Sequence, residues 1–196
     1  MFLRDDDRKE YSDASDIELS RLIQGGDGEA FSELFRRHYN ALYQYGMSFY
    51  ASEAFIKDCI QTLFLRLWRK KERYLKDIQS PKAYLLISLR RIILRDKKKR
   101  AARKERNSEY ARDFSEEIRT IEQRIIAREI TAEHKALLET ALNSLTKRQK
   151  EAFVLRLHQG LDNDEIAYVM DITKGRVEDL IYHATKNIKK EMKIIQ

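Results

Sequence analysis

The segment "TKGRVED", residues 173–179, places charged side chains of both signs within about two helical turns. Lys174 and Arg176 could bind phosphate oxygens, and an arginine can also make a bidentate hydrogen bond to a guanine edge. Glu178 and Asp179 could accept a hydrogen bond from the amino group of cytosine. Alternatively, they could only stabilise the helix by lying near the positive end of its dipole, or they could point into solvent. The segment therefore has residue types that can read DNA, provided that the surrounding elements present them to a groove.

The residues around this segment have the spacing of two short helices joined by a tight turn. Asp162 and Glu165 form a capping-box pattern at the start of the first helix, and Thr173 can cap the second. Ala167 is small enough to let the second helix approach, whereas Asp171 stands where many such turns have glycine. An ordinary three-helix core is the alternative. The apolar positions favour a helix-turn-helix: Ile166, Met170, Ile172, Val177 and Leu180.

The whole chain has a helical pattern. It has 196 residues with one proline and six glycines, too few for an all-β protein with many turns. Helices are predicted at about 16–24, 28–50, 53–73 and from 81 to 100 or beyond, with Ser80 as a cap before Pro81. We therefore predict an all-α fold of two small helical domains joined by a basic linker. The N-terminal domain spans residues 1–101, the linker 102–126, and the C-terminal helix-turn-helix domain 127–196.

The composition favours a polyanionic partner and argues against a disulfide, a metal site, an enzyme active site and a membrane span. The net charge of +7 favours a polyanion. Cys59 is the single cysteine, so no intrachain disulfide can form, and its apolar setting predicts a buried side chain. The four histidines have no metal-ligand spacing, and no phosphate loop or nucleophile motif is present, so neither an enzyme nor a cofactor is predicted. No apolar stretch resembles a secretory signal or could span a bilayer, and we expect a cytoplasmic protein.

Motifs in both halves resemble those of bacterial RNA polymerase sigma factors. "DNDEIAYVMDITKGRVEDL" is similar to the promoter-binding helix-turn-helix of that family. "DCIQTLFLRLW" is similar to its polymerase-binding helix, with Thr62 replacing a glutamate, and "SPKAYLLISLRRIIL" to its promoter-melting helix. In the melting helix Arg91 and Arg95 replace an asparagine and an aspartate, a marked departure. The short chain with two matched regions resembles the extracytoplasmic-function (ECF) group.

The resemblance implies roles for two sets of residues in the N-terminal domain. The first, called here the polymerase patch, would bind core RNA polymerase: Asp58, Gln61, Arg66 and Trp68. The second, called here the melting element, would hold an opened promoter strand with basic side chains and stacking surfaces. It comprises Tyr74, Lys76, Gln79, Lys82, Tyr84, Arg90, Arg91 and Arg95. Packing in the core is the alternative for Trp68 and Tyr84, and a solvated basic face is the alternative for Arg91 and Arg95.

For the C-terminal domain, the resemblance implies promoter contacts from the second helix of the motif. The candidate residues are Thr173, Lys174, Arg176, Glu178, Asp179, Tyr182, His183 and Lys186. We expect Glu178, with its longer side chain, to be the base reader and Asp179 to act on the dipole or face solvent. The implied partners are core RNA polymerase, promoter DNA and an anti-sigma factor of the kind that is often membrane-anchored. No small-molecule substrate is implied.

Two other functions fit parts of the pattern. A helix-turn-helix transcriptional regulator of the response-regulator type would carry a receiver of alternating strands and helices, and residues 1–110 show no strand pattern. A sigma-like interaction protein that no longer reads promoters is the other alternative. The substitutions at Arg91 and Arg95, and the carboxylates Glu178 and Asp179, keep it open.

Overall fold

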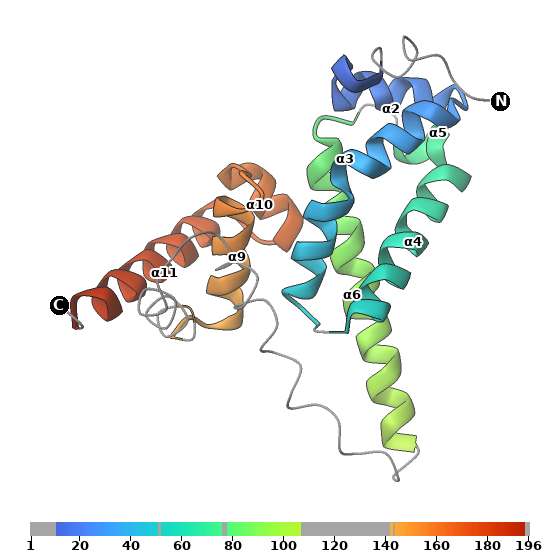
Figure 1. Cartoon of the computed structure of the whole chain (residues 1–196). Helices are drawn as coiled ribbons and strands as arrows, with labels where there is room; N and C mark the ends of the chain where they lie inside the picture. The colour runs from blue at the N-terminus through green and yellow to red at the C-terminus, as the bar shows by residue number, and fades with distance from the viewer. Residues whose placement is uncertain (1–10, 51, 76–77, 107–141, 143, 195–196) are drawn as a thin grey trace.

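The computed structural model describes residues 11–50, 52–75, 78–106, 142 and 144–194. Within these residues every regular element is a helix, which confirms the predicted all-α fold. Figure 1 shows their arrangement. The helices are α2 (Asp16–Gln24), α3 (Gly28–Met47), α4 (Glu53–Arg69), α5 (Lys71–Tyr74), α6 (Pro81–Arg106), α9 (Lys147–Leu157), α10 (Asn163–Met170) and α11 (Lys174–Ile194).

Most helices begin at a side chain that binds their free backbone N–H groups. Capping boxes at Ser15, Thr146 and Asp162 start α2, α9 and α10, and the last of these was predicted. The predicted cap at Ser80 also forms, because its hydroxyl accepts from the backbone N–H of Ala83 at 3.3 Å. Short polar residues before apolar helical repeats therefore set where the chain enters each helix.

The N-terminal domain is a bundle in which α3, α4 and α6 lie side by side, with α2 across one end (Figure 1). Leu34, Ile60 and Leu89 are among the core side chains that these three helices bury almost completely. Helices α3 and α4 meet closely at Gly46, where an added Cβ would lie 2.7 Å from Cγ2 of Ile56. Cys59 is buried in this core, as predicted.

The C-terminal domain folds α9, α10 and α11 around Leu155, Ile166 and Val177. The turn between α10 and α11 uses Asp171 in the left-handed region, at φ 58° and ψ 54°. Aspartate adopts this conformation more readily than most residues, because its short polar side chain can hydrogen-bond locally. The sequence irregularity at Asp171 is therefore accommodated without glycine, and the predicted helix-turn-helix is present.

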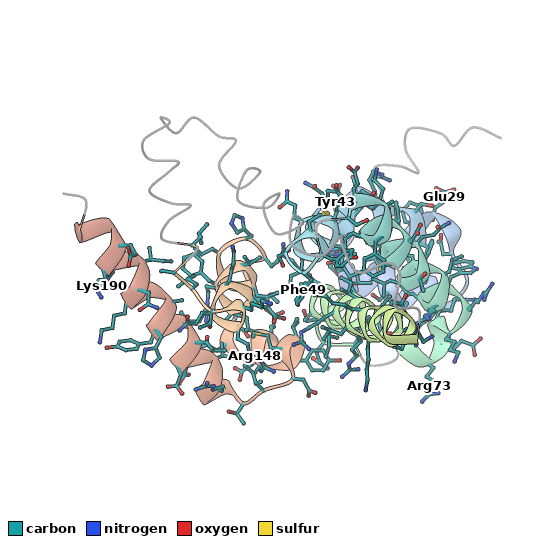
Figure 2. All side chains as sticks on the ribbon, turned by 90° about the horizontal axis from the view of Figure 1, so that it is seen from below. Glu29, Tyr43, Phe49, Arg73, Arg148 and Lys190 are labelled. Carbon is teal, nitrogen blue, oxygen red and sulfur yellow. The ribbon has the colours of Figure 1, made fainter. Side chains whose placement is uncertain are left out.

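The two domains also pack against each other. Helix α10 lies against α6, and most buried apolar side chains of both domains form one continuous cluster, apart from a small second cluster of Leu142, Leu145 and Ala184. In Figure 2, Tyr43 and Phe49 lie on the side of the N-terminal domain that faces the C-terminal domain. Nothing in the sequence pattern predicted this contact, because the residues that make it are far apart along the chain.

Some boundaries differ from those expected. The predicted helix 28–50 ends at Met47, and the predicted helix 53–73 is divided after Arg69 into α4 and α5. Helix α6 continues to Arg106, into the first residues of the expected linker, whereas residues 107–126 of that linker lie outside the described part. No helix in the described ranges has the length and hydropathy of a membrane span.

Candidate nucleic-acid interface

Helix α11 presents one polar face to solvent. All eight side chains expected to contact DNA are exposed there: Thr173, Lys174, Arg176, Glu178, Asp179, Tyr182, His183 and Lys186. The opposite face buries Val177, Leu180 and Ala184 against the rest of the domain. This division follows from the helical spacing of the apolar residues, so the same pattern that fixes the core also fixes the outward face.

The charged residues at the start of this face are paired with one another and with α10. Lys174 Nζ donates to Asp164 Oδ2 at 2.9 Å, and this hydrogen bond raises the pKa of Lys174. Asn163 donates to Glu178 Oε1 at 3.4 Å. Arg176 Nη1 lies 3.7 Å from Asp179 Oδ2, and both side chains are 62% exposed. Pairs exposed to this extent contribute little to stability, so they can exchange for contacts with DNA.

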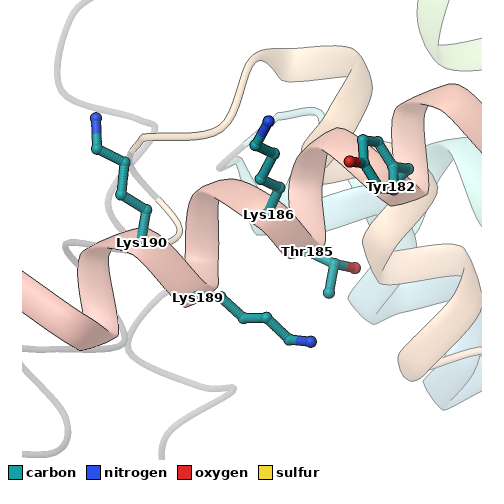
Figure 3. Close-up of a pocket in the computed structure, with 5 residues that line it drawn as sticks. All are labelled: Tyr182, Thr185, Lys186, Lys189 and Lys190. Atoms are coloured by element: carbon teal, nitrogen blue, oxygen red, sulfur yellow. The ribbon is translucent and has the colours of Figure 1, made fainter.

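Further along α11, a shallow basic groove of about 480 Å³ adds Thr185, Lys189 and Lys190 to the residues expected from the sequence. Tyr182, Thr185, Lys186, Lys189 and Lys190 line it, and Figure 3 shows Lys186 and Lys190 extending from one side of the helix. Their four-residue spacing places them on one face, which was a usable sequence signal. Adjacent ammonium groups on one groove suit consecutive phosphates of a nucleic-acid backbone.

The structure divides the melting element into two groups. Gln79, Arg91 and Arg95 are exposed, and Tyr84 is half-buried against the core. Lys82 and Arg90 instead reach the C-terminal domain, where Lys82 Nζ donates to the backbone oxygen of Gln159 and Arg90 Nε to Glu151 Oε1. Lys76 and the side chain of Tyr74 lie outside the described part. The element is therefore only partly accessible in this arrangement.

The polymerase patch lies on α4. Asp58, Gln61 and Arg66 are exposed, whereas Trp68 is half-buried with its ring centroid 5.0 Å from that of Phe31. Lys71 Nζ lies 4.7 Å from the centroid of the Trp68 ring, so this tryptophan has packing partners within the domain. Leu65, which the sequence motif did not single out, is 50% exposed. Leu65 follows Asp58 by seven residues and Gln61 by four, so it lies on the same helical face, one turn beyond Gln61.

Two family models match the chain, one on each domain. The model described as "Sigma-70 region 2" matches residues 34–103, which contain α4 and most of α6. The model described as "Sigma-70, region 4" matches residues 135–188, which contain the helix-turn-helix. Together they cover more than half of the chain, in the order that the sequence motifs predicted. The chain belongs to the sigma-70 family.

Individual relatives agree with this assignment. The ECF RNA polymerase sigma factor BldN of Streptomyces coelicolor is 26% identical over 172 residues. That match covers 88% of this chain and 64% of BldN, so the chain spans less than two thirds of the relative's length. The predicted resemblance to the ECF group is thereby confirmed.

Two solved structures share the fold. CnrH, solved in complex with the cytosolic domain of CnrY, has a TM-score of 0.60 at 22% identity, over 92% of this chain and 99% of CnrH. The sigma factor RpoE of Bartonella quintana, solved with the anti-sigma factor NepR, has a TM-score of 0.62 at 17% identity. That second match covers 85% of this chain and 98% of RpoE.

Proposed function

We propose that this protein is an ECF-type sigma factor that binds core RNA polymerase and directs it to specific promoters. The observation that carries the proposal is that two sigma-70 regions match the two domains, and that most candidate binding residues of each domain are exposed. Region 2 offers the polymerase patch on α4 and the exposed part of the melting element. Region 4 offers the outward face of α11.

Two physical features support a role in promoter recognition. The exposed arginine and lysine side chains of α11 provide both a possible base contact, at Arg176, and a row of phosphate contacts from Lys186 onward. The acidic residues at the start of the helix reduce the attraction to DNA, so the protein depends on a second anchor. Binding to polymerase supplies that anchor by raising the effective concentration of each domain at the promoter.

An antagonist is part of the same proposal. CnrH and RpoE of Bartonella quintana were both solved with a protein bound, and in RpoE that protein is an anti-sigma factor. We infer that this protein is likewise controlled by an anti-sigma factor, and that its action is non-enzymatic.

The test is transcription in vitro with purified core RNA polymerase and a library of promoter fragments. We expect core polymerase plus this protein to start transcripts at a defined set of sites, and core polymerase alone to start none of them. The variant Asp58→Ala/Gln61→Ala should lose initiation and compete poorly for core polymerase while keeping its helical content, because surface substitutions change stability by only about 0.5 kcal/mol. The matched control, Glu53→Ala/Lys57→Ala, removes an exposed ion pair of the same helix.

The outcomes separate the leading proposal from its alternatives. Binding to core polymerase without site-specific initiation would favour a sigma-like interaction protein. Tight, sequence-specific DNA binding without polymerase would favour a conventional helix-turn-helix regulator. If the double variant at Asp58 and Gln61 competes as well as the wild type, the polymerase patch is misplaced.

A further inference from the structure

A buried carboxylate joins the two domains. Glu151 of α9 is only 8% exposed, although it lies in a segment, "KRQKEAF", that looks like an ordinary polar helix start. Its Oε1 atom accepts from the hydroxyl of Tyr45 in α3 at 3.1 Å and from Nε of Arg90 in α6 at 2.8 Å. Tyr45 is fully buried and the Arg90 side chain is 13% exposed. One carboxylate of the C-terminal domain therefore accepts hydrogen bonds from two polar groups of the N-terminal domain and pairs with the charge of Arg90.

Three further hydrogen bonds cross the same boundary. Lys82 donates to the backbone oxygen of Gln159, and Gln159 Nε2 donates to the backbone oxygen of Ala41 at 3.3 Å. Ser80 donates to Glu165 Oε1 at 2.7 Å, while the other oxygen of Glu165 closes the capping box of α10. The contacts thus involve the helix-turn-helix itself and the first turn of the melting helix.

These contacts occupy residues that the proposed function needs elsewhere. Lys82 and Arg90 belong to the melting element, and neither can reach a nucleic-acid strand while bound to Gln159 and Glu151. The outward face of α11 and the polymerase patch on α4 stay exposed in the same arrangement. The packing therefore covers part of the melting element and leaves the outward face of α11 and the polymerase patch accessible.

We propose that Glu151, with its partners Tyr45 and Arg90, forms an autoinhibitory latch that holds the helix-turn-helix domain over the melting element until the two domains separate. This inference rests on the proposed sigma function for its meaning, but the latch itself is a physical contact that can be measured alone. Removing one partner while the domains stay packed is costly, because it leaves the other polar groups buried and unpaired. Opening exposes all of them to water together and frees Lys82 and Arg90.

Protonation equilibria are consistent with a latch that is closed under ordinary conditions. Burial, followed by the nearby Glu151 carboxylate, raises the pKa of the Tyr45 hydroxyl well above its usual value of 10.0. The hydroxyl therefore keeps its proton and remains a donor to Glu151. No change of pH within the physiological range would release this contact through Tyr45.

The first experiment measures the separation of the domains directly. Spin labels are attached to the full chain at Glu29→Cys and Arg148→Cys, two exposed positions on different domains (Figure 2). Cys59 is 2% exposed and stays unlabelled in the folded protein. In the protein with Glu151 intact, we expect one narrow distribution of distances between the two labels. In Glu151→Gln, the population with longer distances should rise at least about tenfold, because removing one partner of a buried charge pair is costly. Tyr45→Phe should give a smaller increase, and the control Glu53→Gln, in an exposed ion pair within α4, should give none.

The second experiment reads the accessibility of the melting element. Acetylation of lysines, followed by mass spectrometry, should show Lys82 protected in the unmodified protein and modified several-fold faster in Glu151→Gln. Lys57 and Lys186, which are exposed and away from the boundary, should react equally in both proteins. Circular dichroism checks that helical content is unchanged, so that exposure through unfolding is recognised.

The results distinguish failure of the latch from failure of the sigma proposal. Equal distances and equal Lys82 reactivity in Glu151→Gln and the unmodified protein would overturn the latch. So would a closed distance that persists on core polymerase at a promoter. If the distances respond to Glu151→Gln but core polymerase starts no specific transcripts, the latch stands and the sigma assignment fails. If transcription is specific but the distances do not respond, only the latch fails.

Discussion

At the scale of single residues, we expect Arg176 and Lys186 to make two different kinds of DNA contact from one helix. Arg176 lies at the start of α11, where we expect a contact with a base edge, whereas Lys186 lies about three turns farther along, in the basic groove. Replacing Arg176 with alanine should relax preference at one base step, since such a contact is worth about 1–3 kcal/mol. Replacing Lys186 should weaken binding to all sequences and reduce the salt slope by about 1. Binding selections at several salt concentrations, with polymerase present, measure both effects, and identical profiles for the two variants would contradict the division.

The carboxylates beside Arg176 can be separated in the same way. Glu178 accepts from Asn163, while Asp179 lies near Arg176, so neither side chain is fixed by burial. We expect Asp179→Asn to raise affinity slightly without changing base preference, because it removes a negative charge near phosphates. Glu178→Gln should change preference at a single position, as loss of an acceptor for cytosine would. If Glu178→Gln behaves like Asp179→Asn, Glu178 does not read a base.

The ionisation of Asp16 should make the free energy of unfolding depend on pH in the acid range. Its carboxylate lies 2.6 Å from His38 Nε2 and 2.7 Å from Arg37 Nη1. Burial opposes ionisation of Asp16, but the hydrogen bonds and charges of His38 and Arg37 outweigh burial and lower its pKa below the usual 3.8. A carboxyl group with a lowered pKa in the folded state stabilises the fold at pH values above its pKa in the unfolded state. This stabilisation is lost as the pH falls through its pKa in the folded state.

Urea unfolding of Asp16→Asn therefore has a defined expected result. The stability difference from the wild type should be largest above about pH 5 and should shrink below the usual pKa of 3.8. Asp13→Asn, at an exposed position, is the matched control and should differ little from the wild type. A difference for Asp16→Asn that stays constant with pH would show that the pair does not favour ionisation of Asp16.

At the scale of elements, the contact between α3 and α4 depends on Gly46. A Cβ at this position would lie 2.7 Å from Ile56 Cγ2, and Ile56 is fully buried. Overpacking costs about 1–3 kcal/mol, whereas alanine in a helix gains about 0.5–1 kcal/mol over glycine. Gly46→Ala should therefore lower the free energy of unfolding, as measured in urea.

A second substitution at Ile56 tests the cause. Ile56→Ala removes Cγ2, so the damage from Gly46→Ala should be smaller in that background. Ile56→Val keeps Cγ2 and should give little relief. Equal penalties for Gly46→Ala in both backgrounds would show that the loss does not arise from this contact.

At the scale of the whole molecule, we expect the packing of the two domains to limit the binding of DNA by the free protein. Two of the basic side chains of the melting element are engaged within the protein, and α11 carries carboxylates beside its cations. We expect the isolated protein to bind duplex promoter DNA poorly, and core polymerase to confer tight, specific binding. Titration of a labelled promoter with and without core polymerase measures this difference. Tight, specific binding by the protein alone would contradict it.

The sequence by itself determined much of the local structure and which side chains of α11 face solvent. Apolar residues at helical spacing predicted the helices, Ser80 and Asp162 predicted two of the caps, and the motif around Ala167 predicted the helix-turn-helix. The exposure of all eight α11 candidates also followed, because on an amphipathic helix the buried face defines the exposed one. These inferences succeed because they depend on residues within a few positions of one another.

Only the tertiary structure decided which polar residues meet across the domains. Glu151 and Arg90 are separated by 61 positions, and Tyr45 and Glu151 by 106. Each looks like an ordinary helical residue in its own segment, so no local pattern marks them as partners. Their contact depends on how two bundles of helices pack, which is set by the shapes and apolar faces of many side chains together. For the same reason, the sequence could place Lys82 and Arg90 on the melting helix but could not show that the C-terminal domain engages them.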